Sequence, residues 1–344
     1  MKNKITFSVT SYQGYEGEIL RILNDNRDIS RTRAYMDWRY LGGRSSVAPK
    51  IFWIIANDGS RIGMCSLIFR SYWVNGKTDN YAVMGDISLD SEYRGKGFGK
   101  RLFEFVNSVI DGESVPCALV IPTDAAKKSL ISSGWEIKEH LIALAFLLNP
   151  YAKIYKKIRN HFISNLLKYL YQKFIWLIID CQTLKGFKVE TVDGIDESFE
   201  KFWNLFRKDN QIIEDRNIET LKWRYLNHPT GRFKIVKIFY NTNLTGFIIY
   251  REINNTCFIY EFMTLDNKKV RQVLFSFIQN LLMESQQIEV IRITLNKNHP
   301  YFKAIRKAGF FIRGKETNLL IHVPVAGSVM NSYRWFVTSG DKDI

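Results

Sequence analysis

Hydrophobic and polar positions along the first 149 residues alternate in the manner of a mixed helix and strand domain. Apolar positions at helical spacing predict helices, and short apolar runs bounded by turn signals such as Asp58-Gly59 and Asn75-Gly76 predict strands. The predicted helices are 14–23, 31–41, 100–110 and 125–132, and the predicted strands are 51–56, 61–70, 81–89, 118–121 and 141–148. This order of elements is typical of α/β or α+β architecture with a mixed sheet.

Residues 151–180 follow a different pattern, in which large apolar residues recur every four positions from Ile154 to Ile178. A step of four residues drifts by about 40° against a helix of 3.6 residues per turn. We therefore expect a break near Asn160–Asn165 and two shorter helices. The segment also holds six Lys or Arg and one Asp. We expect it to pack against both flanking domains, and the alternative is a helix lying on an anionic membrane surface.

The second half of the chain repeats the first weakly but in the same order. Three pairs of segments correspond, with offsets of 185, 176 and 175 residues: 36–41 (MDWRYL) with 221–226 (LKWRYL), 87–90 (ISLD) with 263–266 (MTLD), and 133–135 (SGW) with 308–310 (AGF). Three matches in one order indicate a duplicated domain. We therefore divide the 344 residues into a domain at 1–149, a basic amphipathic helical linker at 150–185 and a second domain at 186–344.

Composition and charge narrow the classes of partner. Apolar residues make up 46% of the chain, which excludes a disordered protein, and 49 Lys and Arg against 34 Asp and Glu give a formal charge of +15. Such a charge favours anionic partners. No basic run with interleaved aromatic residues matches a nucleic-acid module, so we expect no nucleic-acid partner.

The cysteines, the N-terminus and the hydropathy predict a cytoplasmic protein. The four cysteines (Cys65, Cys117, Cys181 and Cys257) are far apart, with no His or Cys at metal spacing, so we expect reduced, buried thiols and no metal. The N-terminus has no apolar segment of the secretory kind. No run of 18 apolar residues predicts a membrane span.

The segment Arg94-Gly95-Lys96-Gly97-Phe98-Gly99-Lys100 carries the clearest chemistry, because it follows a predicted strand and opens a predicted helix. Glycines allow positive φ and close approach of a ligand to the backbone, and the amides at a helix N-terminus favour phosphate. A dinucleotide fold requires G-x-G-x-x-G, which the spacing of these glycines fits poorly, and a P-loop requires Ser or Thr after its Lys. Both are disfavoured, and a basic glycine turn without a ligand is the remaining alternative.

The loop resembles the acetyl-CoA signature of the GNAT acetyltransferase superfamily, Q/R-x-x-G-x-G/A, with Arg94, Gly97 and Gly99 at its fixed positions. The later Gly134-Trp135 is similar to the Gly-Phe/Trp pair before the last strands of such domains. The resemblance covers about residues 30–148. It implies a fold in which two neighbouring strands splay apart around acetyl-CoA.

The resemblance also implies the binding residues. Pantetheine would pair with the backbone near Ile87 and Leu89, and the pyrophosphate would lie on the amides of the loop. The cofactor-binding residues that we predict are Ile87, Leu89, Arg94, Gly95, Lys96, Gly97, Phe98, Gly99 and Lys100. The reaction would be direct transfer of acetyl to a primary amine, which needs a base for the ammonium proton and an acid for the leaving thiolate.

The residues at the positions of the family's general acid and base differ from the family pattern. Leu130 stands where many members carry a Tyr as acid, and Thr123 and Asp124 lie near the place of a common Asn. We predict Asp86, directly or through water, and Asp124 as catalytic residues. Tyr93 and His140 are further candidates, and positioning with water alone is another alternative.

The second domain has Asn267-Lys268-Lys269-Val270-Arg271 in place of the loop, without glycine, so we expect it to be a degenerate GNAT-like domain. Such tandem chains resemble proteins of bacterial surface-polysaccharide synthesis, which implies an anionic amino-sugar acceptor. The repeated Trp-Arg-Tyr and the tail at 333–341 carry that resemblance. The alternatives are a drug- or amino-acid-acylating enzyme, a CoA- or partner-binding module without turnover, and a peripheral membrane scaffold.

Overall fold

The computed structural model describes residues 5–43, 47–182, 186–284, 287–324 and 333–342. The elements of the first half are β1 (Thr6–Thr10), α1 (Glu16–Asp25), α2 (Arg33–Leu41), β2 (Lys50–Ile55), β3 (Arg61–Val74), β4 (Lys77–Leu89), α3 (Phe98–Ile110), β5 (Ala118–Val120), α4 (Asp124–Ser132) and β6 (Glu136–Leu147). Every helix and strand predicted in this half is present. The strand β1 was not predicted, because this short edge strand has no continuous apolar run.

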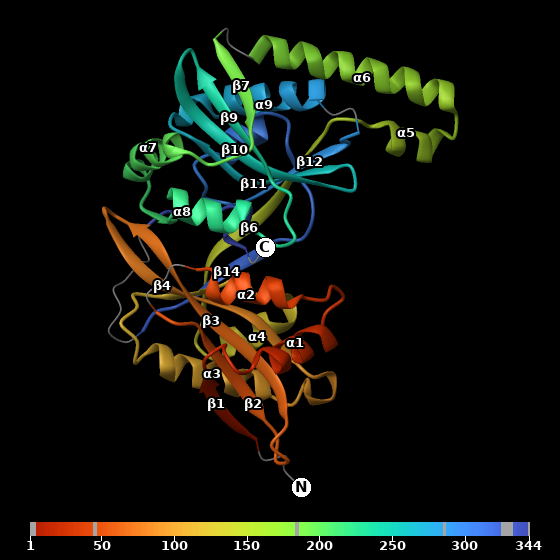
Figure 1. The fold of residues 1–344 in the computed structure, drawn as a ribbon. Coiled ribbons are helices and arrows are strands. Elements are labelled where there is room, and N and C mark those ends of the chain that lie inside the picture. The colour runs from red at the N-terminus through yellow and green to blue at the C-terminus, as the bar shows by residue number, and fades with distance from the viewer. Residues whose placement is uncertain (1–4, 44–46, 183–185, 285–286, 325–332, 343–344) are drawn as a thin grey trace.

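The second half repeats this order of elements. After the helices α5 (Tyr151–Ile158) and α6 (His161–Gln182) come β7 (Phe187–Val192), α7 (Glu197–Phe206), β8 (Ile212–Glu214), α8 (Ile218–Leu221), β9 (Lys234–Tyr240), β10 (Asn243–Ile253), β11 (Thr256–Thr264), α9 (Val270–Glu284), β12 (Val290–Asn296), α10 (Phe302–Lys307), β13 (Phe311–Ile312), β14 (Thr317–His322) and β15 (Trp335–Phe336). Figure 1 shows the two halves one above the other, with α6 along the far edge of the second half.

One mixed sheet runs through both halves in the order β1-β2-β3-β4-β5-β14-β6-β12-β11-β10-β9-β7. The last long strand of each half crosses to the other: β14 pairs with β5, and β6 pairs with β12 over seven residues. The division at 149 and 186 therefore stays a prediction about folding units, because strand pairing crosses it in both directions. The mixed α/β fold class is confirmed.

The two Trp-Arg-Tyr segments meet where the halves face each other. The rings of Trp38 and Trp223 stack with centroids 5.0 Å apart. Each indole Nε1–H donates to the backbone carbonyl of the other tryptophan, at 2.7 Å from Trp38 and 3.0 Å from Trp223. Reciprocal contacts of this kind are typical of a two-fold interface. The repeat thus forms a pseudo-symmetric contact inside one chain.

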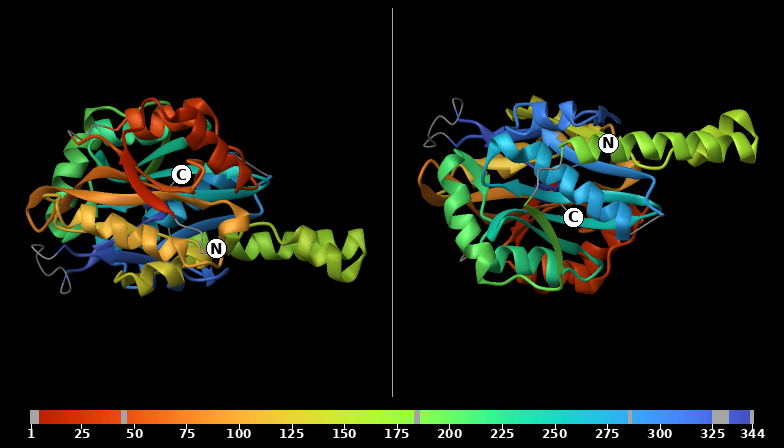
Figure 2. Two further views of the ribbon diagram at one scale, coloured as in Figure 1. Left: turned by 90° about the horizontal axis from the view of Figure 1, so that it is seen from below. Right: turned by 90° about the horizontal axis from the view of Figure 1, so that it is seen from above.

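The linker breaks where it was expected to, at Arg159 and Asn160, and the φ of Arg159 is 53°. We predicted that both halves pack against the apolar stripe of the linker, and this is wrong for the face of α6 that points to solvent. Only one face of α6 packs, through Ile175 and Ile179, against the core of the second half. Figure 2 shows α5 and the start of α6 extending beyond the rest of the molecule.

Three thiols, Cys65, Cys117 and Cys257, are free and buried, and burial raises the pKa of each. The side chain of Cys181 lies outside the described residues. No helix in the described part of the chain is long and apolar enough to cross a membrane. Among the same residues, no group of three His, Cys, Asp or Glu could hold a metal ion.

Candidate active site

A bulge in β4 decides which backbone groups of this strand are free. The register with β3 shifts beside Asp86, and the φ of Asp86 is 48°, in the left-handed region. Beyond the bulge, the Asp90 amide donates to the carbonyl of Ile62 in β3 at 2.9 Å. Because backbone groups of successive strand residues point to opposite sides, those of Ile87 and Leu89 face away from β3.

The strands β4 and β5 are paired only at one end. They pair in parallel at Ala82 with Ala118 and at Val83 with Leu119. Past Val83, the rest of β4 has no strand partner on this side among the described residues. The open edge can therefore receive an extended ligand as an added strand.

The helix α3, which follows β4 and the glycine loop, begins with amides that lack partners. Gly97 precedes the helix with a φ of 79°, and its carbonyl accepts the Arg101 amide at 3.4 Å, so that the amides of Phe98, Gly99 and Lys100 have no intrahelical partner. No side chain caps this helix. A Cβ on Gly95 or Gly97 would meet nothing within 4 Å, so that the loop borders open space. A helix terminus with free amides, no cap and open space beside it favours an anion.

The basic residues of the loop have different surroundings. Arg94 donates from Nε to the carbonyl of Leu89 at 2.9 Å and from Nη2 to Asn26 at 2.5 Å, which ties the loop to the end of β4. Lys96 lies 5.3 Å from the ring centroid of Tyr93. Lys100 is half exposed and pairs with Glu104 at 3.5 Å. The Leu89 carbonyl is therefore hydrogen-bonded to Arg94 and cannot pair with a ligand. Lys96 and Lys100 place positive charge near the start of α3.

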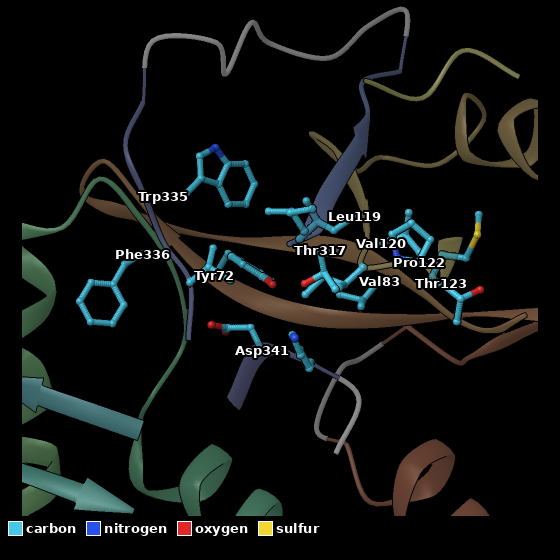
Figure 3. Close-up of a pocket in the computed structure, with 15 residues that line it drawn as sticks. Tyr72, Val83, Leu119, Val120, Pro122, Thr123, Thr317, Trp335, Phe336 and Asp341 are labelled. Carbon is cyan, nitrogen blue, oxygen red and sulfur yellow. The ribbon is translucent and has the colours of Figure 1, made fainter. Parts of the chain in front are cut away.

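A cavity of about 300 Å³ lies where β4 and β5 part (Figure 3). Val83 of β4 and Leu119 and Val120 of β5 give it apolar walls. The hydroxyl of Thr123 and the side chain of Lys342 are among its polar lining, and burial lowers the pKa of Lys342. The cavity thus has apolar walls from β4 and β5 and a polar part that contains Thr123 and Lys342.

The C-terminal tail closes one side of this cavity. Trp335 packs into the core of the first half, whereas Phe336 packs into the core of the second, since successive strand residues point to opposite faces. Figure 3 shows the two rings on opposite sides of the tail. Asp341 ends the segment and pairs with Arg216 at 2.6 Å. Sequence reasoning did not place the tail in the site, although its cluster of aromatic residues was the available signal.

The predicted catalytic residue Asp86 is buried among cations. Its carboxylate pairs with Arg39 Nε at 2.6 Å and Arg27 Nη2 at 2.9 Å, and accepts the hydroxyl of Tyr40 at 2.7 Å. Burial raises the pKa of Asp86, but Arg39 and Arg27 outweigh this effect and hold the pKa below its ordinary value. A carboxylate so held fixes the bulge and is a weak base at neutral pH.

The other candidates lie apart from this cluster. Asp124 begins α4, is exposed, and accepts a hydrogen bond from Lys315 that lowers its pKa. Leu130 is fully buried, so the position of the family's Tyr faces the core. His140 of β6 pairs with Glu316, and the ring of Tyr93 lies near that of Phe98 at the glycine loop. The structure does not bring these residues together with Asp86 into one constellation.

The second half has the same opening, but the chain fills it. The 3-10 turn Ser339–Asp341 lies between β11 and β12: Ser339 Oγ accepts the Thr294 amide at 3.2 Å, and Thr338 Oγ1 donates to Glu261 at 3.2 Å. At the start of α9, the carboxylate of Asp266 accepts the Lys268 amide at 2.8 Å. Both the strand edge and the helix terminus of the second half are therefore occupied by the chain itself, and the degeneracy of this half stays a prediction.

Glu261 of β11 is the counterpart of Asp86 in its surroundings. It pairs with Arg216 Nε at 2.9 Å and accepts the hydroxyl of Tyr225 at 2.6 Å, while Arg224 Nη1 lies 3.7 Å away. The repeated Arg-Tyr pair therefore lies against a buried carboxylate in both halves, on β4 in the first and on β11 in the second. Sequence comparison found the repeat but not the carboxylates, which lie far along the chain.

Residues 18–111 match the model of the acetyltransferase (GNAT) family. This range contains β4, the glycine loop and α3. Among curated proteins, none matches this sequence.

Several solved structures share the fold over nearly the whole chain. A probable N-acyltransferase from Enterococcus faecalis is 12% identical, with a TM-score of 0.65 over 93% of this chain and 73% of that one. A GCN5-related N-acetyltransferase from Anabaena variabilis is 15% identical, with a TM-score of 0.65 over 92% and 73%. The N-myristoyltransferase of Saccharomyces cerevisiae with bound myristoyl-CoA is 10% identical, with a TM-score of 0.56 over 95% and 86%. The sequence match over residues 18–111 and the fold shared over nearly the whole chain therefore relate this protein to the GNAT acyltransferases.

Proposed function

We propose that the chain is an N-acyltransferase that uses acetyl-CoA and transfers the acetyl group to a primary amine of a small molecule. The observation that carries the proposal is the opening between β4 and β5, which borders the cavity at Val83 and Leu119, while the uncapped terminus of α3 follows β4 along the chain. Acetyl-CoA would supply an activated thioester. The chain would supply binding, orientation and control of protons.

The residues present fit the donor. The amides of Phe98, Gly99 and Lys100 would hold the pyrophosphate, and Lys96 would add charge at the same place. The free backbone groups of Ile87 and the amide of Leu89 would pair with the pantetheine arm. Arg94 would act as a brace, because its guanidinium binds the Leu89 carbonyl and Asn26.

The acceptor would enter from the cavity side. Its polar end contains Thr123 and Lys342, and the Lys342 ammonium favours an acceptor that carries a negative group. Asp341 lies beside it, but its charge is balanced by Arg216 at 2.6 Å. An anionic amino sugar is the acceptor class that we propose to test first.

Asp86 and Asp124 are the proposed groups for proton transfer, and one variant separates a base from a positioning residue at Asp86. If Asp86 accepts the proton, Asp86→Asn lowers kcat and removes the acidic limb of its pH profile. If Asp86 only holds the bulge, the variant loses stability, because Arg39 and Arg27 lose their partner, and the pH profile keeps its shape.

The test of the function is calorimetric titration with acetyl-CoA, with thiol release followed against a panel of primary amines that includes amino sugars. Saturable binding with release on one amine supports the transferase. Binding without release on any amine supports a CoA-binding module. Absence of binding overturns the proposed donor site.

Three variants locate the donor. Gly97→Asn keeps the left-handed backbone, which Asn tolerates, whereas Gly97→Asp adds a negative charge in the same conformation. We expect Gly97→Asp to weaken binding of acetyl-CoA much more than Gly97→Asn. Asn267→Asp adds the same charge before α9, where Asp266 already caps the turn, and should leave binding unchanged. Equal binding by wild type and Gly97→Asp would place the pyrophosphate elsewhere.

A second candidate function is transfer of a longer acyl chain. The apolar walls of the cavity favour it, because Val83, Leu119 and Val120 can bury methylene groups. A series of acetyl-, butyryl- and octanoyl-CoA separates the two donors. A KM that falls steadily with chain length favours the longer chain, whereas a KM that is lowest for acetyl-CoA supports the first proposal.

A further inference from the structure

The helix α6 presents a continuous apolar face to solvent. Seven large apolar side chains form this outer face, with exposed fractions between 38% at Leu167 and 79% at Phe162. They are Phe162, Ile163, Leu166, Leu167, Leu170, Phe174 and Leu177. At about 100° per residue they lie within a sector of about 140° of the helix surface. Single exposed apolar residues are ordinary, but a contiguous patch of this kind marks an interaction site.

The opposite face holds α6 on the body. Ile175 and Ile179 are buried in the core of the second half, and the Tyr171 hydroxyl donates to the Leu147 carbonyl at the end of β6, at 2.7 Å. The outer face is therefore directed away from the protein by packing. Figure 2 shows α5 and the adjoining end of α6 projecting from the body, where an extended surface can reach them.

Positive charge is concentrated next to this face. Residues 151–180 contain six Lys or Arg and one Asp. Lys153, Lys156, Lys157 and Arg159 of the helix α5 and its end are all exposed. Lys173 lies at the edge of the outer face, three residues from Leu170. Apolar residues on one side with flanking cations match a bilayer interface that carries anionic headgroups.

We propose that the α5–α6 hairpin docks the protein on the surface of an anionic lipid bilayer, with α6 in the plane of the membrane. The outer face would enter the boundary between headgroups and acyl chains, and the lysines would contact lipid phosphates. No described helix can span a bilayer, so the contact is peripheral. This inference goes beyond the proposed acyl transfer and does not depend on it.

The test is flotation of the purified full chain with vesicles of phosphatidylcholine alone and with vesicles that contain about a quarter phosphatidylglycerol, a negative surface of the kind that attracts basic segments. We expect binding only to the anionic vesicles. Leu170→Glu should weaken it by about tenfold or more, because an apolar contact is replaced by a charge. Leu205→Glu on α7 is the matched control, since Leu205 and Leu170 are 55% and 53% exposed. Lys156→Gln should weaken binding by about fivefold.

Three results would overturn the proposal. These are absence of binding to anionic vesicles, equal binding to both vesicle types, and equal losses from Leu170→Glu and Leu205→Glu. If the chain binds no vesicles but forms a dimer that Leu170→Glu dissociates, the outer face is a contact between copies. Acyl transfer to a soluble amine should be unchanged in Leu170→Glu, so that failure of docking and failure of the proposed function are distinguishable.

Discussion

His299 should make the second half less stable at acidic pH. Its ring centroid lies 4.2 Å from that of Phe336, and its Nδ1 accepts the Tyr301 amide at 3.1 Å. In the described part of the chain, its Nε2 has no hydrogen-bond partner. Burial lowers the pKa of His299 from 6.5 to about 3. The imidazole is therefore neutral in the native protein over most of the acidic range.

The unfolded chain binds this proton near pH 6.5, whereas the native chain excludes it until about pH 3. Stability that is present above pH 6.5 is consequently lost as the pH falls through this window. By linkage, lowering the pH from 7 to 5 removes about 2 kcal/mol of unfolding free energy through this one group. Because His299 supports Phe336, acid should loosen the tail that borders the cavity.

Urea unfolding at pH 7 and pH 5 measures the effect. In His299→Asn, the side-chain oxygen can accept the Tyr301 amide but does not titrate. Between pH 7 and pH 5, the free energy of unfolding should fall by about 2 kcal/mol more in the wild type than in this variant. His161→Asn, at an exposed position on α6, should keep the wild-type dependence. Equal pH dependence of wild type and His299→Asn would refute the reasoning.

Three further predictions concern the tail and the contact between the halves. A Cβ at Gly340 would overlap the carboxylate of Glu261, so Gly340→Ala should lower the free energy of unfolding by about 1–3 kcal/mol, measured in urea. Glu261→Gln removes the charge that Arg216 pairs with at 2.9 Å, and should lower stability by about 3–5 kcal/mol in the same assay. Trp38→Ala and Trp223→Ala should each destabilise the chain, and a double-mutant cycle should show a coupling of about 0.5–3 kcal/mol; strict additivity would contradict the reciprocal contact.

The elements and the loop followed from local pattern. Helix and strand periodicity depends on residues close in sequence, so the elements of the first half and the break near Asn160 were predictable. The glycine loop was predictable for the same reason, because positive φ at Gly95 and Gly97 and a free helix terminus are local properties. The role of Asp86 was not, because its partners Arg39 and Arg27 lie 47 and 59 residues away along the chain.

The sequence by itself determined the mixed α/β fold, the repeat and the glycine loop before a helix, because each rests on short-range spacing or on direct comparison of segments. Only the tertiary structure decided that β6 and β14 cross between the halves. It also decided that the tail fills the opening beside β11 while the opening beside β4 contains a cavity. These features depend on which distant strands and side chains meet, and that outcome is set by packing of the whole chain and not by local pattern.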